Sequence, residues 1–183
     1  LLMQTPAAAL GSCRYKLGDP EENKEDFEEI LQIFRRHEIR YFIYIGGNDS
    51  MDTIKKLSDY AIVFGHSIRF IGCPKTIDND IWGTDMTFGF QSAVDIATDT
   101  IDKIHTTATS HSRVFIVEVM GHKVGWLTLH AGIAGGADII LLPEIPYDIN
   151  EIAKVIEKRE QAGKRFSILA VAELSLIHIS EPT

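Results

Sequence analysis

Short apolar runs alternate along this chain with segments in which apolar residues recur every three or four positions. Continuous runs rich in β-branched and aromatic residues predict buried strands, whereas the longer spacing predicts amphipathic helices. Because apolar strands separated by helices form parallel sheets covered on both faces, the pattern predicts one α/β domain built on a single sheet. Strands are expected at 41–45, 68–72, 114–119, 137–142 and 166–172, and helices at 20–37, 50–60, 90–104, 125–133 and 150–162.

The residues at the expected helix ends support these boundaries. Asp19 can cap the first helix and Pro20 suits its first position, while the acidic residues that follow complement the helix dipole. The last helix is expected to start after Asp148, which with Glu151 resembles a capping box, and to stop at Gly163.

Composition narrows the class of protein. The chain has 183 residues, a hydrophobic content of 45% and a net charge of −8, which is typical of a folded globular domain. The acidic balance argues against nucleic acid or an anionic membrane surface as partners, and no apolar run is long enough for a transmembrane helix. Cys13 and Cys73 form neither a disulfide framework nor a zinc pattern, so a reduced, cytoplasmic protein is expected.

The loops that follow the strands are the candidate site, because ligands of parallel sheets bind at the carboxyl ends of the strands. The first such loop is Gly46-Gly47-Asn48-Asp49-Ser50. Its glycines allow a ligand to approach the backbone closely. The N-terminus of the helix that follows favours the binding of anions. A plain strand-to-helix turn would have the same pattern. Asp49 would repel a phosphate unless a metal ion or a lysine intervenes.

The second and third loops carry charged groups. The second, Pro74-Lys75-Thr76-Ile77-Asp78-Asn79-Asp80, contains two aspartates and a lysine. One aspartate can act as a general base while the other holds Mg²⁺; Asx turns in a polar loop are the alternative. In the third loop Gly121 allows close backbone approach, and His122 and Lys123 are cationic donors. Arg113 lies at the opposite end of the strand expected at 114–119, which precedes this loop. From there it could bind a ligand of a neighbouring subunit.

Taken together, these segments resemble the 6-phosphofructokinase family, and the resemblance covers residues 1–173. It implies a parallel, Rossmann-like three-layer sheet in a partial copy of the family's amino-terminal, donor-binding lobe. It also implies phosphoryl transfer to fructose 6-phosphate in glycolysis, with Mg²⁺ as cofactor. The matching segments are 46–50, 74–80 and 118–121, together with 11–14, 110–113 and 131–136.

The resemblance assigns roles to individual residues. Asp78 is implied as the general base that takes the proton from the 1-hydroxyl of fructose 6-phosphate. Binding of this substrate is implied for Thr76, Ile77, Asp78, Met120, Gly121, His122 and Glu173 and, across a subunit interface in a homo-oligomer, for Arg113. Donor binding is implied for Arg14, Gly47, Asn48, Asp49, Ser50 and Lys75, and magnesium binding for Asn48 and Asp80.

Two residues bear on the identity of the donor. In family members that use ATP the position of Asp49 is a glycine, which leaves room for the nucleotide's inner phosphate, so a carboxylate there repels a polyanion. Lys75 is a glycine in many bacterial ATP users and offers a compact cation to a small donor. The pair resembles the pyrophosphate-dependent branch, which implies transfer from pyrophosphate to give fructose 1,6-bisphosphate and phosphate. An ATP-dependent 6-phosphofructokinase is the alternative.

Three features depart from the family pattern. Asn48 replaces the usual aspartate and His122 the usual arginine, which makes a non-catalytic sugar-phosphate or nucleotide sensor the second alternative. Retention of Asp78 and Asp80 argues against a sensor. Residues 174–183 resemble translated sequencing adapter and are expected to be a non-native tail. Because the family's second lobe is absent, the chain by itself is expected to be inactive.

Overall fold

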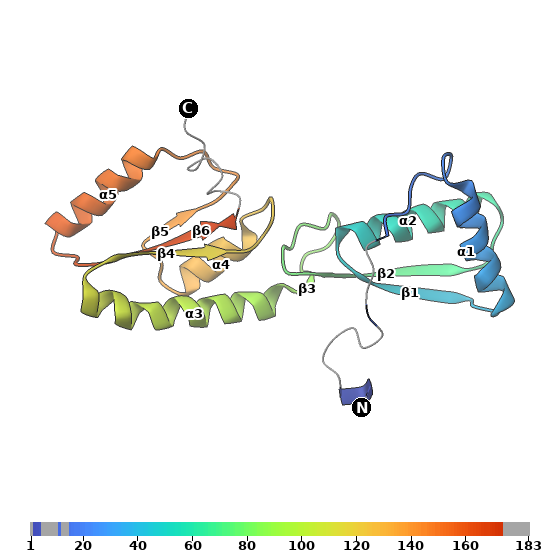
Figure 1. The fold of residues 1–183 in the computed structure, drawn as a ribbon, viewed down its shortest axis with the longest axis horizontal. Coiled ribbons are helices and arrows are strands. Elements are labelled where there is room, and N and C mark those ends of the chain that lie inside the picture. The colour runs from blue at the N-terminus through green and yellow to red at the C-terminus, as the bar shows by residue number, and fades with distance from the viewer. Residues whose placement is uncertain (1, 5–10, 12–14, 174–183) are drawn as a thin grey trace. The chain divides into compact units, whose positions relative to one another are not determined.

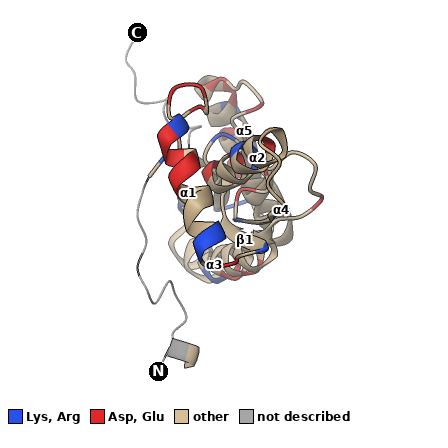
Figure 2. Ribbon diagram, turned by 90° about the vertical axis from the view of Figure 1, so that its right-hand side faces the viewer, with Lys and Arg blue, Asp and Glu red and all other residues tan. Residues whose placement is uncertain are grey.

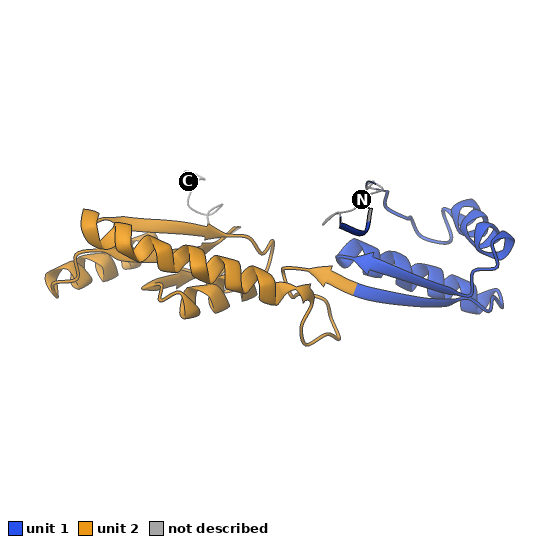
Figure 3. Cartoon of the chain, turned by 90° about the horizontal axis from the view of Figure 1, so that it is seen from below, with its two compact units in different colours: residues 1–73 blue, residues 74–183 orange. Residues whose placement is uncertain are grey.

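The computed structural model describes residues 2–4, 11 and 15–173, which form two compact units divided between Cys73 and Pro74 (Figures 1 and 3). The predicted alternation of strands and helices is confirmed, in an α/β fold with parallel sheets. The elements are a 3-10 helix (Leu2–Gln4), α1 (Lys24–Arg36), β1 (Tyr41–Gly46), α2 (Asn48–Val63), β2 (Arg69–Thr76), β3 (Phe88–Gly89), α3 (Phe90–His111), β4 (Val114–Val119), α4 (Trp126–Ala134), β5 (Ile139–Leu141), α5 (Ile149–Gln161) and β6 (Ser167–Ala172).

The strands form two three-stranded sheets, with the orders β1-β2-β3 and β4-β6-β5. Strands β2 and β3 are parallel, as are β4 and β6 and also β5 and β6. The sequence pattern predicts a single sheet, whereas the described residues form two. The apolar pattern identifies which residues form strands, but it carries no information on which strands are neighbours.

The core of the first unit lies on one face of its sheet. Phe27, Leu31 and Phe34 of α1 are buried together with residues of α2, and Phe42 and Phe70 of the strands pack against them. Helix α1 is therefore amphipathic, as the spacing of its apolar residues predicts.

In the part of the chain that the structure describes, the opposite face of this sheet is exposed along β1. Tyr41, Ile43 and Ile45 of β1 alternate with the inward-facing positions and remain 70%, 58% and 64% exposed. In the described part of the unit both helices cover the same face, whereas the sequence pattern predicts cover on both.

The second unit has the predicted three layers. Ile168 and Ala170 of β6 pack against α3 and α4, whereas Leu169 and Val171 pack against α5 on the other face. All six residues of β6 are buried, as expected of a central strand covered on both sides.

The first helix begins later than predicted. Asp19 does not cap it and Pro20 is not its first residue, because the main-chain oxygen of Asp19 accepts from Glu22 (3.1 Å) and Asn23 (2.9 Å) in a separate turn. Asn23 occupies the N-cap position of α1. The predicted charge arrangement is nevertheless present, with acidic side chains in the first turn and two arginines in the last (Figure 2).

Other boundaries agree more closely. The Asp148 side chain accepts a hydrogen bond from Asn150 N–H (2.8 Å) and caps α5, which ends before Gly163 at a φ of 82°. Helices α2 and α3 and strand β2 extend beyond their predicted ends, and β5 is shorter than predicted. The 3-10 helix and β3 were not expected. None of the helices in the described part of the chain combines the length and hydropathy needed to cross a bilayer.

Candidate active site

Two predicted site aspartates follow the carboxyl end of β2. The strand ends at Thr76, whose Oγ accepts a hydrogen bond from the backbone N–H of Asp78 (3.2 Å). Asp78 and Asp80 are both half-buried. The side chain of Ile77 is partly buried and packs against a core cluster that contains Phe90.

Asp78 has a perturbed acidity. Burial raises the pKa of its carboxyl above the ordinary aspartate value, and the neighbouring charge of Asp80 raises it further. The Thr76 hydroxyl and His122 lower this pKa, while Glu173 raises it. A carboxylate in such surroundings binds a proton more readily than an exposed aspartate does, which suits a general base.

Neighbouring strands bring two further predicted segments to the same end of the second unit. Val119 of β4 pairs with Ala172 of β6, so residues 120–122 leave the sheet beside Glu173. The backbone N–H of His122 donates to Glu173 Oε2 (3.2 Å). The structure therefore brings together residues that the sequence analysis assigned to substrate binding from three loops.

The backbone of the third loop is tightly constrained. Gly121 has a φ of 154°, and a Cβ atom there would lie 2.6 Å from the carbonyl oxygen of Val124. His122 follows with a φ of 52°, in the left-handed region that few non-glycine residues adopt. This local geometry presents the His122 N–H to Glu173.

Sequence reasoning missed Glu144, which follows β5. Its Oε1 accepts a hydrogen bond from the backbone N–H of Gly125 (2.8 Å) at the amino end of α4. The carboxylate thereby caps the helix that begins directly after the third loop. The sequence offers no signal for this contact, because an N-cap supplied from a distant loop leaves no local motif.

The predicted donor loop opens α2 in the first unit. Gly47 is the N-cap residue of α2 and, as a glycine, has no side chain with which to cap the helix. Ser50 folds back over the end of β1, since a Cβ atom on Gly46 would lie 2.1 Å from Ser50 Oγ. Asn48 and Asp49 are exposed, so their side chains are accessible from solvent.

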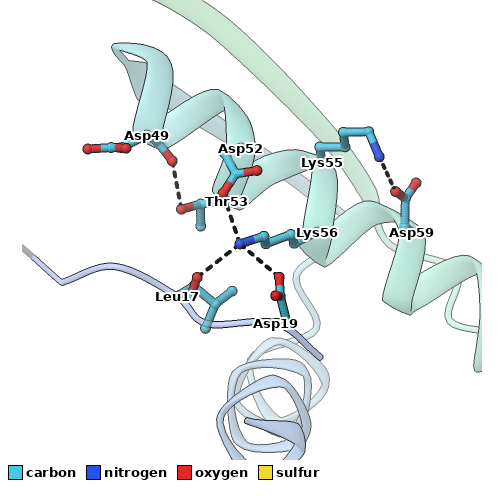
Figure 4. A network of polar contacts seen from close by, with 8 residues as sticks. All are labelled: Leu17, Asp19, Asp49, Asp52, Thr53, Lys55, Lys56 and Asp59. Carbon is cyan, nitrogen blue, oxygen red and sulfur yellow. Dashed lines mark hydrogen bonds and ion pairs between the residues drawn. The ribbon is translucent and has the colours of Figure 1, made fainter. Parts of the chain in front are cut away.

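The carboxylate of Asp49 stands apart from the other charges of α2. Lys56 Nζ contacts Asp52 Oδ2 (3.0 Å), Asp19 Oδ1 (3.3 Å) and the carbonyl oxygen of Leu17 (3.3 Å). In Figure 4 the Asp49 side chain points away from this cluster. Lys56 therefore neutralises other carboxylates, and the negative charge of Asp49 remains at the amino end of the helix.

The structure places two of the three basic residues that the sequence analysis assigned to the site. Arg113 is exposed and directly precedes β4, so it lies at the other end of that strand from Met120. This placement agrees with the expectation that Arg113 does not serve the site of its own chain. Lys75 is exposed and lies in β2, in register with Phe88 of β3. Arg14 lies outside the described residues.

The predicted magnesium ligands are oxygen donors in both units: Asn48 in the first and Asp80 in the second. Within residues 2–4, 11 and 15–173 no group of three or more His, Cys, Asp or Glu side chains is arranged to hold a metal ion. Mg²⁺ that binds together with phosphates needs only one or two carboxylates. Asp80, with Asp78 beside it, thus fits a magnesium–phosphate complex better than a metal ion held by protein groups alone.

Comparison with known proteins identifies the family. A model of the family described as phosphofructokinase matches residues 1–180, and the chain belongs to this family. It is 60% identical over 155 residues to an ATP-dependent 6-phosphofructokinase of Chloroflexus aurantiacus, covering 85% of this chain and 42% of that protein. It is 48% identical over 174 residues to the ATP-dependent 6-phosphofructokinase of Spirochaeta thermophila, covering 91% and 46%. The chain thus spans less than half the length of these two relatives.

Solved structures share the fold. A pyrophosphate-dependent phosphofructokinase from Marinobacter aquaeolei matches with a TM-score of 0.78 and 35% identity, over 92% of this chain and 43% of that one. The phosphofructokinase of Saccharomyces cerevisiae matches with a TM-score of 0.74 and 31% identity, over 91% of this chain and 25% of that one. The named relatives and neighbours thus include enzymes of both donor types.

Proposed function

We propose that this chain is part of an enzyme that transfers a phosphoryl group to the 1-hydroxyl of fructose 6-phosphate. The observation that carries the proposal is the electrostatic influence of His122 and Glu173 on Asp78. His122 and Glu173 are themselves joined by a hydrogen bond beyond the paired ends of β4 and β6. Membership of the phosphofructokinase family supports the same reaction.

In this mechanism Asp78 accepts the proton of the 1-hydroxyl as the sugar oxygen attacks the terminal phosphorus of the donor. The bond from that phosphorus to the bridging oxygen breaks, and phosphate leaves when pyrophosphate is the donor. A positioned base of this kind contributes about 10²–10⁴-fold to the rate. Asp80 and Asn48 would hold Mg²⁺, which supplies charge neutralisation to the phosphates. The sugar is held by Thr76, Ile77, Met120, Gly121, His122 and Glu173, with Arg113 contributed by a neighbouring subunit of a homo-oligomer.

The proposed donor is pyrophosphate. Asp49 places a carboxylate in the first turn of α2, where a helix would otherwise attract phosphate. Its exposure leaves this charge to act on a bound donor, which disfavours the longer polyphosphate chain of a nucleotide. Lys75 supplies a compact cation, and Gly47 and Ser50 complete the loop, with Arg14 as a further donor-binding residue.

ATP is the second candidate donor, and the names of the relatives at 48% and 60% identity favour it. The deciding experiment assays the full-length protein that contains this chain with fructose 6-phosphate and either pyrophosphate or ATP. Activity with pyrophosphate alone supports the proposed donor, and activity with ATP alone overturns it. No activity with either donor overturns the proposed function itself.

Two variants separate the charge of Asp49 from its size. Asp49→Asn removes the charge and keeps the volume, whereas Asp49→Gly removes both. If repulsion excludes ATP, Asp49→Asn gains activity with ATP; if volume excludes it, only Asp49→Gly does. Unchanged use of ATP in both variants contradicts the argument from Asp49.

The remaining parts of the proposal have simple tests. Asp78→Ala should lower turnover about 10²–10⁴-fold and leave fructose 6-phosphate binding detectable by calorimetry. A sensor would show binding and no turnover even in the wild-type protein. Residues 1–173 alone should be inactive in a coupled assay; activity equal to that of the full-length protein would refute this.

Mass spectrometry of the protein from its natural source will show whether residues 174–183 are foreign. A reducing, cytoplasmic setting is part of the same proposal.

A further inference from the structure

One buried threonine ties together the two ends of the loop that carries Asp78. Thr87 Oγ donates to the carbonyl oxygen of Thr76 (2.8 Å), and the backbone N–H of Thr87 donates to Asn79 Oδ1 (2.9 Å). Thr76 and Asn79 lie on either side of Asp78 in sequence. Both flanks of the aspartate are therefore anchored to the same residue.

The anchor is built to be rigid. Thr87 is 3% exposed, so its hydrogen bonds are shielded from competing water. It directly precedes β3, which pairs with β2 through Lys75–Phe88 and Thr76–Gly89. Thr87 thus adds a side-chain bond to a very short ladder of strand pairs.

Asn79 is suited to its position by its backbone. Its φ is 57°, in the left-handed region, which asparagine tolerates better than most residues do. This conformation turns the chain between Asp78 and Asp80, while the amide oxygen reaches Thr87. Glycine would adopt this conformation but lose the hydrogen bond, and most other residues would meet backbone strain.

We propose that Asn79 and Thr87 are positioning residues, which hold the Asp78 carboxylate at the place where it must meet the 1-hydroxyl of the sugar. This inference rests on the proposed function. A displacement of about 1 Å at a reacting group is enough to cost about 10²-fold in rate. Loosening the anchor should therefore lower kcat, although neither side chain needs to contact the substrate.

The test compares steady-state kinetics of variants of the full-length protein. Thr87→Val removes the hydroxyl with almost no change in volume and should lower kcat about 10- to 100-fold, with a smaller change in the KM for fructose 6-phosphate. Thr87→Ser keeps the hydroxyl and should recover most of the rate. Thr84→Val is the matched control, because it removes a hydroxyl that bonds within the same loop to Ile81 O (2.7 Å) and should leave kcat unchanged.

Asn79 gives an independent arm of the same test. Asn79→Gly tolerates the left-handed backbone but removes the amide, so it should lower kcat even where Thr87→Val fails to fold. The double variant should lose little more than either single variant, because both break one network. Folded Thr87→Val and Asn79→Gly proteins with wild-type kcat would overturn the inference. A wild-type protein inactive with both donors would instead overturn the proposed function, before any variant is compared.

Discussion

Asp138 offers the sharpest test of the energetics of the second unit. Its Oδ1 pairs with Arg159 Nη2 at 2.5 Å, and its Oδ2 accepts the backbone N–H of Ile168 at 2.9 Å. The side chains of Asp138 and Arg159 are only 18% and 26% exposed. One carboxylate thus joins the start of β5 to both α5 and β6.

Replacing Asp138 separates two contributions to stability. Asp138→Ala leaves the N–H of Ile168, a fully buried residue, without this acceptor, which costs about 1–3 kcal/mol. Loss of the ion pair adds about 1 kcal/mol, because Arg159 is exposed enough to regain water. Asp138→Asn can keep an oxygen for the Ile168 N–H, so it should lose only the ion-pair part, about 1 kcal/mol.

Urea denaturation measures the difference through tryptophan fluorescence. Trp126 lies in the second unit and is 47% exposed, so its emission follows the unfolding of the unit that contains Asp138, whereas Trp82 is 98% exposed and contributes little change. Asp138→Ala should lower the unfolding midpoint by about 1–2 M and Asp138→Asn by less than half as much. Equal losses in the two variants would refute the role given to the Ile168 hydrogen bond.

Four further predictions concern the residues of the candidate site. Because burial and Asp80 raise the pKa of Asp78, kcat/KM should fall with decreasing pH at a midpoint above the ordinary aspartate value of about 4. By the same linkage Asp78→Asn should be more stable than wild type at pH 7, with a difference that closes as the pH falls through the raised pKa, as thermal melts would show. Glu144→Ala should lose about 1–2 kcal/mol of unfolding free energy by removing the cap on α4, and Glu144→Gln should restore most of it in urea titrations. Gly121→Ala should weaken fructose 6-phosphate binding in calorimetry, because the new Cβ would lie 2.6 Å from Val124 O; unchanged binding would contradict the geometry described for this loop.

The sequence predicted much of the site because its chemistry is local. Apolar runs locate the strand ends, and Asp78, His122 and Glu173 each lie within a few residues of one. The position of Arg113 at the far end of β4 was equally predictable, because it follows from chain direction alone. The roles of these residues in catalysis and binding remain predictions.

The missing parts depend on contacts between residues distant in sequence. The Glu144–Gly125 and Asp138–Ile168 hydrogen bonds join segments that no local pattern relates. The division into two sheets was missed for the same reason, since strand order is set by tertiary packing. Asp19 was wrongly predicted to cap the first helix. Residues 19–23 instead form a separate turn just before α1, and the same residue types favour both structures.

The open face of β1 has a practical consequence for work with this chain. Tyr41, Ile43 and Ile45 form an apolar row on a strand that ends the order β1-β2-β3. Exposed hydrophobic edge strands promote intermolecular pairing and aggregation. Samples of the isolated polypeptide should therefore self-associate as concentration rises. Ile43→Lys should delay the onset of light scattering without disturbing the helices on the opposite face.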